Sequence, residues 1–338
     1  MPQLCRRAFL AGTAAFLSLP AVAAPDLAAL QRSASSETGD LTWYEANRLD
    51  ALDRIGSAFS RGPGGRLRVR AESIPGGTGI VGRVVNEKQA GGRTADLVTL
   101  GSSGIARLQE RNLLEPTDWG ALGFPTSGIA GPALLTAAAL YGVVYNTRLV
   151  PPEAVPKRWE DLLEPRWQGK IGTWVRAAAF AELAFVWGEQ RTTAFYEAFL
   201  RQRPLMFRST APLAQQVAAG EVALGVGVLH TATPAIRRGA PVSVALLDPT
   251  PVSAVWSAVV AGARRPNGAR LLAGWLATPE GAQVYEAATD RGNPLVTETE
   301  TGRRTGGLTL SEWPMERKDE YTRLYEAYNA GVNESEAR

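Results

Sequence analysis

The chain has 338 residues, of which 45% are hydrophobic and 20% charged, and its formal net charge is +3. This composition indicates a globular protein long enough for two domains and excludes a disordered or fibrous chain. The nearly balanced charge, without a run of five like charges, also argues against nucleic acid as a partner.

Residues 1–24 have the composition of an export signal. The pair Arg6 and Arg7 precedes an apolar run, as in export signals of the twin-arginine type. Small residues at 21–24 then provide a cleavage site. The run is too short to span a bilayer. We expect cleavage after Ala23 or Ala24, a periplasmic location and a mature charge of about +1. The alternative is an ordinary Sec signal that happens to carry two arginines.

Residues 25–40 are small and polar, and we expect them to form a flexible leader. After them, strands and helices alternate. The predicted strands cover 41–44, 67–71 and 95–100, and the predicted helices cover 49–59, 78–89 and 105–111. This order predicts a parallel sheet wrapped by helices.

The second half repeats the pattern, so the expected fold class is α/β. Strands are predicted at 139–145, 170–173, 222–228, 242–247 and 255–261. Helices are predicted at 159–163, 180–187, 193–201, 268–277, 280–289 and 321–328.

The histidine and cysteine content limits the chemistry. The chain has one of each, His230 and Cys5, and Cys5 lies in the signal. Zinc sites and Ser–His or Cys–His pairs depend on these residue types. We therefore expect no metal site, no cofactor and no enzymatic activity. An exported enzyme using carboxylates is the alternative from another class, although no pair of carboxylates has a defensible catalytic spacing.

Two turns in the first half are candidate ligand sites. Gly77, Thr78 and Gly79 open a predicted helix, where backbone N–H groups and the helix dipole favour an anion. Ser102 and Ser103 follow a predicted buried strand, at the sheet edge where open α/β sheets bind ligands. The alternative in both cases is ordinary turn and capping chemistry.

Other candidates follow strands in each half. Tyr44 and Asn47 come after the first strand, with a polar turn as the alternative. Thr173, Trp174 and Arg176 follow a strand of the second half. An arginine fork matches a carboxylate or phosphate, although Arg176 could equally form a surface ion pair.

Short segments spread along the chain carry a family resemblance. They are residues 76–79 (GGTG), 95–98 (ADLV), 113–116 (LLEP), 142–147 (GVVYNT), 156–162 (PKRWEDL), 167–172 (WQGKIG), 220–225 (GEVALG) and 277–283 (ATPEGAQ). In this order they resemble the type 2 periplasmic solute-binding proteins of ABC importers, in particular the ferric-iron-binding-like branch.

The resemblance implies two α/β lobes joined by two crossing strands, with the ligand in the cleft between them. Lobe 1 would comprise residues 41–140 and 255–338, and lobe 2 residues 141–254. The same resemblance places Tyr145 near a crossing strand and Ser209 beside the cleft. It also implies a monomer whose partners are a small solute and the membrane subunits of an ABC permease.

One departure from the family concerns the cargo. Ferric members carry two adjacent tyrosines after the strand headed by a Gly-Glu motif, whereas here that region holds His230 and Thr231 and no tyrosine. We therefore expect a small anionic or polar organic solute, contacted by these two residues, rather than ferric iron. A periplasmic sensor that signals to a membrane kinase is the alternative output of the same fold.

Overall fold

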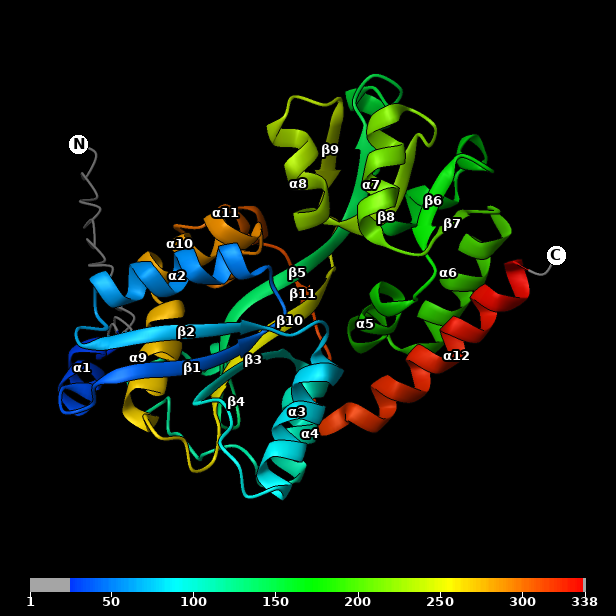
Figure 1. The fold of residues 1–338 in the computed structure, drawn as a ribbon. Helices are drawn as coiled ribbons and strands as arrows, with labels where there is room; N and C mark the ends of the chain where they lie inside the picture. The colour runs from blue at the N-terminus through cyan, green and yellow to red at the C-terminus, as the bar shows by residue number, and fades with distance from the viewer. Residues whose placement is uncertain (1–24, 337–338) are drawn as a thin grey trace, which may run out of the picture.

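The computed structural model describes residues 25–336 as two lobes that share one long antiparallel strand pair (Figure 1). The pair consists of β5 (Ala133–Asn146) and β10 (Thr250–Val259). Residues 134–140 of β5 pair with 252–257 of β10, and residues 141–145 of β5 then pair with β8 (Leu224–Val228) in the second lobe. The α/β fold class is therefore confirmed.

Lobe 1 contains the sheet order β2-β1-β3-β10-β5. Helices cover both faces of this sheet. The strands that complete this sheet are β1 (Gly39–Glu45), β2 (Leu67–Ser73), β3 (Leu97–Gly101) and the short β4 (Ile129–Ala130). One face packs against α2 (Leu49–Arg61), α9 (Pro266–Leu276) and α10 (Pro279–Thr289). The other face packs against α3 (Gly77–Gln89) and α4 (Ser102–Glu110).

Lobe 2 is built in the same way around the far end of β5. Its further strands are β6 (Ile171–Trp174), β7 (Leu205–Phe207) and β9 (Val242–Ala245). One core includes α5 (Ala178–Trp187) and α6 (Glu189–Arg201), and the other includes α7 (Thr210–Ala219) and α8 (Leu229–Arg237). The chain ends with α11 (Glu300–Thr305), β11 (Leu310–Ser311) and α12 (Lys318–Glu336).

A buried chain of hydrogen bonds crosses the lobe 1 sheet. Trp43 Nε1 on β1 donates to Thr99 Oγ1 on β3 at 2.8 Å. The Ser257 hydroxyl on β10 lies 2.7 Å from Thr99 Oγ1 and 2.6 Å from Thr136 Oγ1 on β5. Because buried polar groups are costly unless paired, these contacts favour one register for four neighbouring strands.

Residues 25–40, predicted to be a flexible leader, instead form regular secondary structure. They form α1 (Leu27–Ala34) and then enter β1 at Gly39. The Asp26 carboxylate accepts a hydrogen bond from Ala29 N–H at 2.8 Å, while Leu30 and Ala34, one turn apart, are buried in the core that includes α9. Apolar burial and a capped helix start therefore hold this segment. The predicted export signal, residues 1–24, lies outside the described residues.

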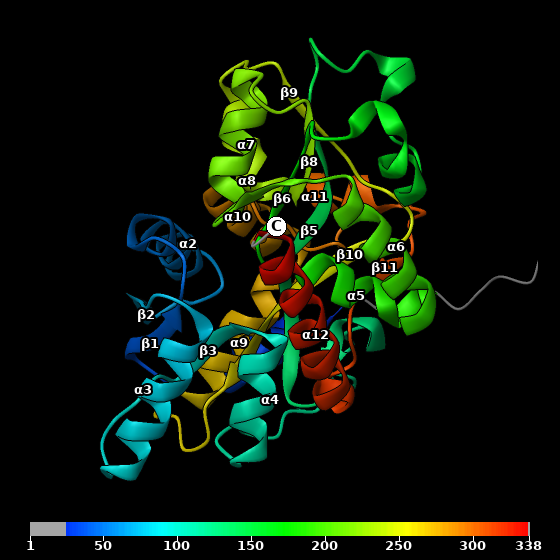
Figure 2. The ribbon, with the colours of Figure 1, turned by 90° about the vertical axis from the view of Figure 1, so that its right-hand side faces the viewer.

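The last helix, α12, was predicted to belong to lobe 1 but packs mainly against lobe 2. Leu324 and Tyr328 of α12 are buried with α5 and α6 of lobe 2, and Tyr196 Oη donates to Tyr328 O at 2.9 Å. At its start, Lys318 forms an ion pair with Glu110 of α4, so α12 runs along the outside of both lobes (Figure 2). No helix in the described residues, including this one, is long and apolar enough to cross a membrane.

Close packing of α10 against α9 gives a stability prediction. A Cβ on Gly281 would lie 2.0 Å from Trp275 O, which is backbone and cannot swing away. We expect Gly281→Ala to lower the free energy of unfolding by about 2 to 3 kcal/mol, measured by urea denaturation. The matched control is Gly82→Ala in α3, where a Cβ meets nothing within 4 Å and should stabilise by about 0.5 to 1 kcal/mol. Equal effects of the two variants would contradict this packing.

Candidate functional site: the cleft between the lobes

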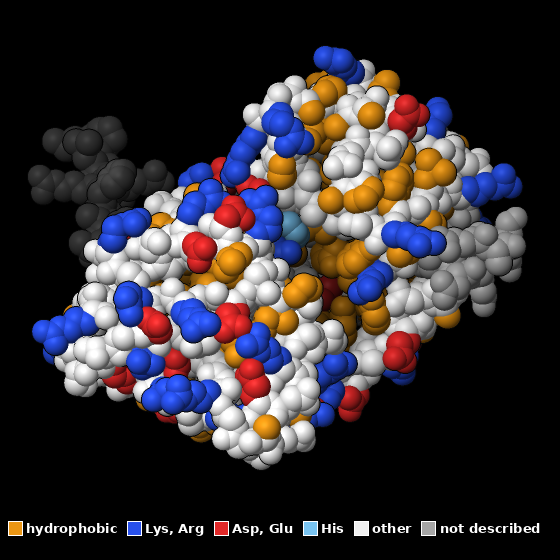
Figure 3. Space-filling model, in the orientation of Figure 1, with side chains coloured by type: hydrophobic (Ala, Val, Ile, Leu, Met, Phe, Trp, Pro, Cys, Tyr) orange, Lys and Arg blue, Asp and Glu red, His pale blue; other side chains and the backbone are white. Residues whose placement is uncertain are grey.

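A hollow separates the two lobes (Figure 3). The pale blue side chain on its wall is the only histidine of the chain, His230. Hydrophobic side chains and an acidic group lie deeper in the hollow, where Figure 1 draws β10 and β11. The hollow therefore combines an apolar lining with a few polar groups, as ligand sites commonly do.

Several helices begin shortly after a strand without a side-chain cap, and three of them carry predicted residues. These three are α3 after β2, α4 after β3 and α8 after β8. Gly76 precedes α3 with φ +72°, a conformation that favours glycine. The first N–H groups of such helices lack partners within the helix and carry the positive end of its dipole. Ser209, predicted to lie beside the cleft, instead caps α7, accepting from Ala211 N–H at 3.4 Å.

His230 and Arg291 join the two lobes. Arg291 Nη2 lies 3.2 Å from His230 Nε2, and Arg291 directly follows α10 and its C-cap residue, Asp290. Because a guanidinium only donates, Nε2 accepts and the ring proton is on Nδ1. Burial, and secondly the charge of Arg291, lowers the pKa of His230 to about 3. The imidazole is therefore neutral near pH 7. Arg237 of α8 and Asp290 form a second contact between the lobes at 2.5 Å.

Both partners of the His230–Arg291 contact keep an unused donor. His230 Nδ1 and Arg291 Nε are enclosed and have no hydrogen-bond partner among the described residues. An enclosed donor without an acceptor costs about 1 to 3 kcal/mol. Two donors therefore remain unsatisfied by the described residues at the junction between the lobes.

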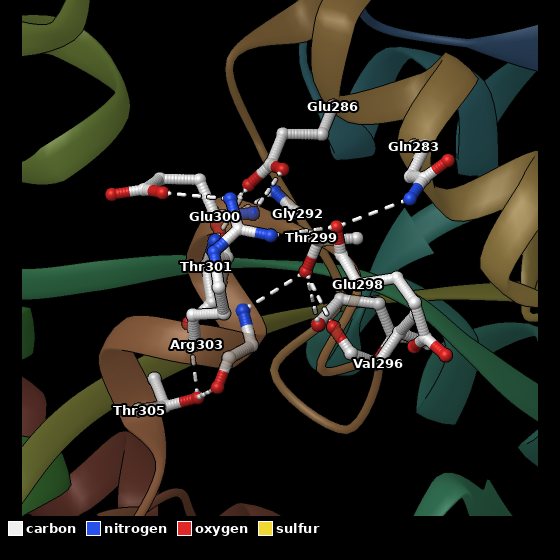
Figure 4. Close-up of polar contacts among 12 residues, drawn as sticks. Gln283, Glu286, Gly292, Val296, Glu298, Thr299, Glu300, Thr301, Arg303 and Thr305 are labelled. Atoms are coloured by element: carbon white, nitrogen blue, oxygen red, sulfur yellow. Dashed lines mark hydrogen bonds and ion pairs between the residues drawn. The ribbon is translucent and has the colours of Figure 1, made fainter.

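A polar network behind Arg291 fixes its backbone (Figure 4). Gly292 N–H donates to Thr301 Oγ1 at 3.1 Å, and Thr301 N–H donates to Glu286 Oε1 at 2.8 Å. Gly292 O accepts from Ala138 N–H of β5 at 2.9 Å. A Cβ at position 292 would lie 2.1 Å from Glu286 Oε1, so only glycine allows this network to close. Arg291 is thus tied to the strand that joins the lobes.

Ser102 is engaged inside lobe 1. Its hydroxyl donates to Glu312 Oε1 at 2.7 Å and accepts from Trp256 Nε1 at 2.9 Å. Burial raises the pKa of Glu312 to about 7. The start of α4 therefore faces a carboxyl group of this chain, which follows β11 directly. Neighbouring Ser103 is exposed.

Several predicted residues lie at the uncapped helix starts. Gly77, Thr78 and Gly79 open α3, and Thr78 and Gly79 are exposed. Thr231 lies in the first turn of α8 beside His230, where its hydroxyl donates to Val228 O at 2.8 Å.

Three predicted residues have other structural roles. The Tyr44 hydroxyl lies 3.1 Å from Glu87 Oε2, and the Arg83 guanidinium lies 4.5 Å from its ring centroid. Burial is the main cause that raises the pKa of Tyr44 to about 12. Thr173 is only 3% exposed within β6, and Tyr145 packs against the lobe 2 core.

The remaining three are half-buried or exposed. Asn47 Nδ2 donates to Tyr285 Oη at 3.1 Å. Trp174 Nε1 donates to Arg208 O at 3.2 Å, and the Arg176 guanidinium lies 5.6 Å from the Trp174 ring. Arg176 is exposed and forms no ion pair within residues 25–336. Arg291 and Glu312 were not among the predicted residues, because each lies in a loop whose sequence is typical of polar turns.

The raised pKa of Glu312 predicts a pH effect. In the folded protein the carboxyl keeps its proton to about pH 7, whereas in the unfolded chain it ionises near 4.5. The folded state therefore loses stability as pH rises through that interval. Relative to Glu312→Gln, the wild type should lose about 3 kcal/mol of unfolding free energy between pH 4.5 and pH 8. Urea denaturation at both pH values measures this, and parallel curves would refute it.

The lowered pKa of His230 predicts an effect of opposite sign. Protonation favours the unfolded chain, so the contribution is complete above pH 6.5 and is lost as pH falls toward 3. Between pH 6.5 and pH 4.5, the wild type should lose about 2 kcal/mol relative to His230→Gln. The same denaturation series measures it, and a His230→Gln curve as steep as that of the wild type would show that the ring is protonated in the folded state.

Solved structures with the same fold are periplasmic binding proteins. Iron-bound HitA from Pseudomonas aeruginosa aligns with a TM-score of 0.69 and 15% identity, covering 87% of this chain and 99% of its own. AfuA from Actinobacillus pleuropneumoniae, with bound fructose-6-phosphate, aligns with a TM-score of 0.67 and 19% identity, covering 88% of this chain and 99% of its own. Trichodesmium FutA, in complex with iron and citrate, aligns with a TM-score of 0.70 and 18% identity, covering 88% of this chain and 99% of its own. At these identities the likeness establishes the two-lobed fold alone.

Sequence comparison supplies the family. An uncharacterized protein of Haemophilus influenzae is 28% identical over 137 residues, which span 38% of this chain and 40% of that relative. The family model described as bacterial extracellular solute-binding protein matches residues 92–302. The chain therefore belongs to the bacterial extracellular solute-binding proteins, and its fold is that of the type 2 periplasmic binding proteins of ABC importers.

Proposed function

We propose that this chain captures a small organic solute with an anionic, oxygen-rich group in the cleft and delivers it to an ABC permease. The observation that carries the proposal is the pair of enclosed, unpartnered donors, His230 Nδ1 and Arg291 Nε, at the lobe junction. A carboxylate or phosphate would supply the acceptor oxygens that both donors lack.

Further donors support an anionic guest. The uncapped start of α3 presents Thr78, and that of α4 presents the exposed Ser103. Arg176 is exposed at the end of β6 in lobe 2, without an ion pair in the described chain. A guest oxygen reached from both lobes would favour the closed arrangement over the open one, because the contacts from the second lobe form only on closure.

The proposed hinge lies where β5 and β10 pass between the lobes, near residues 140 and 254. Lobe 1 would then comprise residues 25–140 with 255–317, and lobe 2 residues 141–254, with α12 packed against it. Closure changes the relative position of the outer faces of the lobes, which a permease can detect. Residues 1–24 would direct the chain to the periplasm through a twin-arginine signal, where it would act as a monomer.

The guest class is further narrowed by Glu312. This carboxyl follows β11, which pairs with β10, one of the two strands that join the lobes. A carboxyl group can accept hydrogen bonds from hydroxyl groups. A phosphorylated sugar or a hydroxy acid would satisfy both the donors and this acceptor, and AfuA, with its bound fructose-6-phosphate, shows that the same fold accommodates a sugar phosphate.

A ligand panel tests the proposal. Purified protein is screened by thermal denaturation against sugar phosphates, phosphonates, hydroxy acids and simple carboxylates. A true ligand at a hundredfold excess over its Kd should stabilise the fold by about 2.7 kcal/mol. His230→Gln and Arg291→Gln should each weaken its binding about tenfold or more, because each removes a donor at the junction.

The control variant is Arg238→Gln, an exposed arginine at the end of α8 that forms no ion pair within the described chain. It should leave the Kd unchanged. The proposal fails if no anionic compound stabilises the protein and native mass spectrometry of fresh protein finds no bound solute. It also fails if a ligand binds equally well to the wild type and to both junction variants.

A further inference from the structure

A second hollow, of about 520 Å³, lies on lobe 1 away from the cleft. It extends along one face of β1 and β2, because residues 40, 42 and 44 of β1 and residues 68, 70 and 72 of β2 all line it. The start of β1 at Gly39 and Arg68 near the start of β2 both line it. Figure 3 shows basic and acidic side chains gathered over this part of lobe 1. We call this hollow the β1–β2 groove.

Three acidic side chains of the β1–β2 groove are already paired with two of its arginines. Asp40 Oδ1 lies 2.9 Å from Arg68 Nη2. Glu72 and Glu87 lie 2.7 and 2.8 Å from the guanidinium of Arg83. These five groups leave one negative charge over, and Glu87 is also in contact with the Tyr44 hydroxyl at 3.1 Å.

The fourth acidic side chain, Asp96, is turned toward the backbone. It is 3% exposed and accepts hydrogen bonds from Thr42 N–H at 2.9 Å, Arg264 N–H at 2.7 Å and Arg265 N–H at 3.0 Å. Its charge is therefore largely balanced by N–H dipoles. These bonds also place the two arginines of the β10–α9 turn at the rim of the groove.

Three guanidinium groups of the β1–β2 groove remain uncommitted. Arg70, Arg93 and Arg264 are exposed, and their side chains make no ion pair or hydrogen bond with any residue from 25 to 336. They come from three different elements: β2, the α3–β3 loop and the β10–α9 turn. Thr94, which follows Arg93 in the chain, also lines the groove, and its Oγ1 is enclosed without a partner among the described residues.

We infer that the β1–β2 groove is a second ligand site, for a soluble molecule that carries two or more phosphate groups. Guanidinium forks match phosphate oxygens, and three forks from three elements suit a multiply charged chain better than a single ion. The volume lies within the range of small-molecule sites. This inference does not depend on what binds in the cleft, because the residues proposed to bind in the cleft and those proposed to bind in the β1–β2 groove are different.

Tripolyphosphate is the probe, used with the full chain in isothermal titration at about 150 mM salt, where exposed charges are largely screened. We expect saturable binding with one site. The variant R70Q/R93Q/R264Q should raise the Kd at least about tenfold, while its thermal unfolding shows that it still folds.

The matched control, R148Q/R201Q/R238Q, removes three exposed arginines of lobe 2 and so changes the net charge equally. Its Kd should stay within about twofold of the wild type. Equal weakening in both triple variants would show attraction by net charge alone and overturn the site, as would the absence of saturable binding to the wild type. Sedimentation with phosphatidylglycerol vesicles, without tripolyphosphate binding, would assign the groove to lipid headgroups and overturn the soluble ligand.

Discussion

The antiparallel pairing of β5 with β10 is the constraint on which the rest of the structure depends. Both strands pass through the junction, and the hydrogen bonds of residues 134–140 with 252–257 fix their register. The buried hydroxyl chain from Thr136 through Ser257 to Thr99 extends that register across lobe 1. Because Ala138 N–H also holds Gly292 O, the same strand positions Arg291. The proposed hinge and the candidate ligand-binding group are therefore parts of one backbone arrangement.

The electrostatics of the junction follow from this placement. Arg291 is tied to β5 through Gly292, and His230 lies in the first turn of α8. The contact at 3.2 Å between them therefore depends on the present arrangement of the two lobes. Burial keeps the imidazole neutral, which leaves one charged and one neutral donor rather than two repelling cations. Glu312, whose pKa is raised by burial, adds an acceptor at the start of α4. A guest with both acceptor and donor oxygens complements this combination.

Much of the fold could be predicted from the sequence, because β1, β2 and β3 alternate with apolar-faced helices that start within a few residues of the expected positions. The helix α8 was not predicted because Pro234 lies inside it, and α11 was not predicted because its six residues carry no apolar side chain. The helix starts could be predicted from glycine and serine turns. The pairing of His230 with Arg291 could not, since 61 positions separate them and neither local pattern encodes that contact. Tyr44 was misleading because its side chain turns under α3, toward Glu87.

The single histidine allows one direct measurement of the central claim, which is that neutral His230 offers Nδ1–H to an anionic guest. Nitrogen-15 NMR of protein labelled at histidine reports both ring nitrogens without assignment ambiguity. We predict a neutral ring protonated at Nδ1 at pH 7, and a shift of the Nδ1 resonance when the solute identified by the panel saturates the protein. A ring protonated at both nitrogens, or resonances that do not move on saturation, would contradict the account.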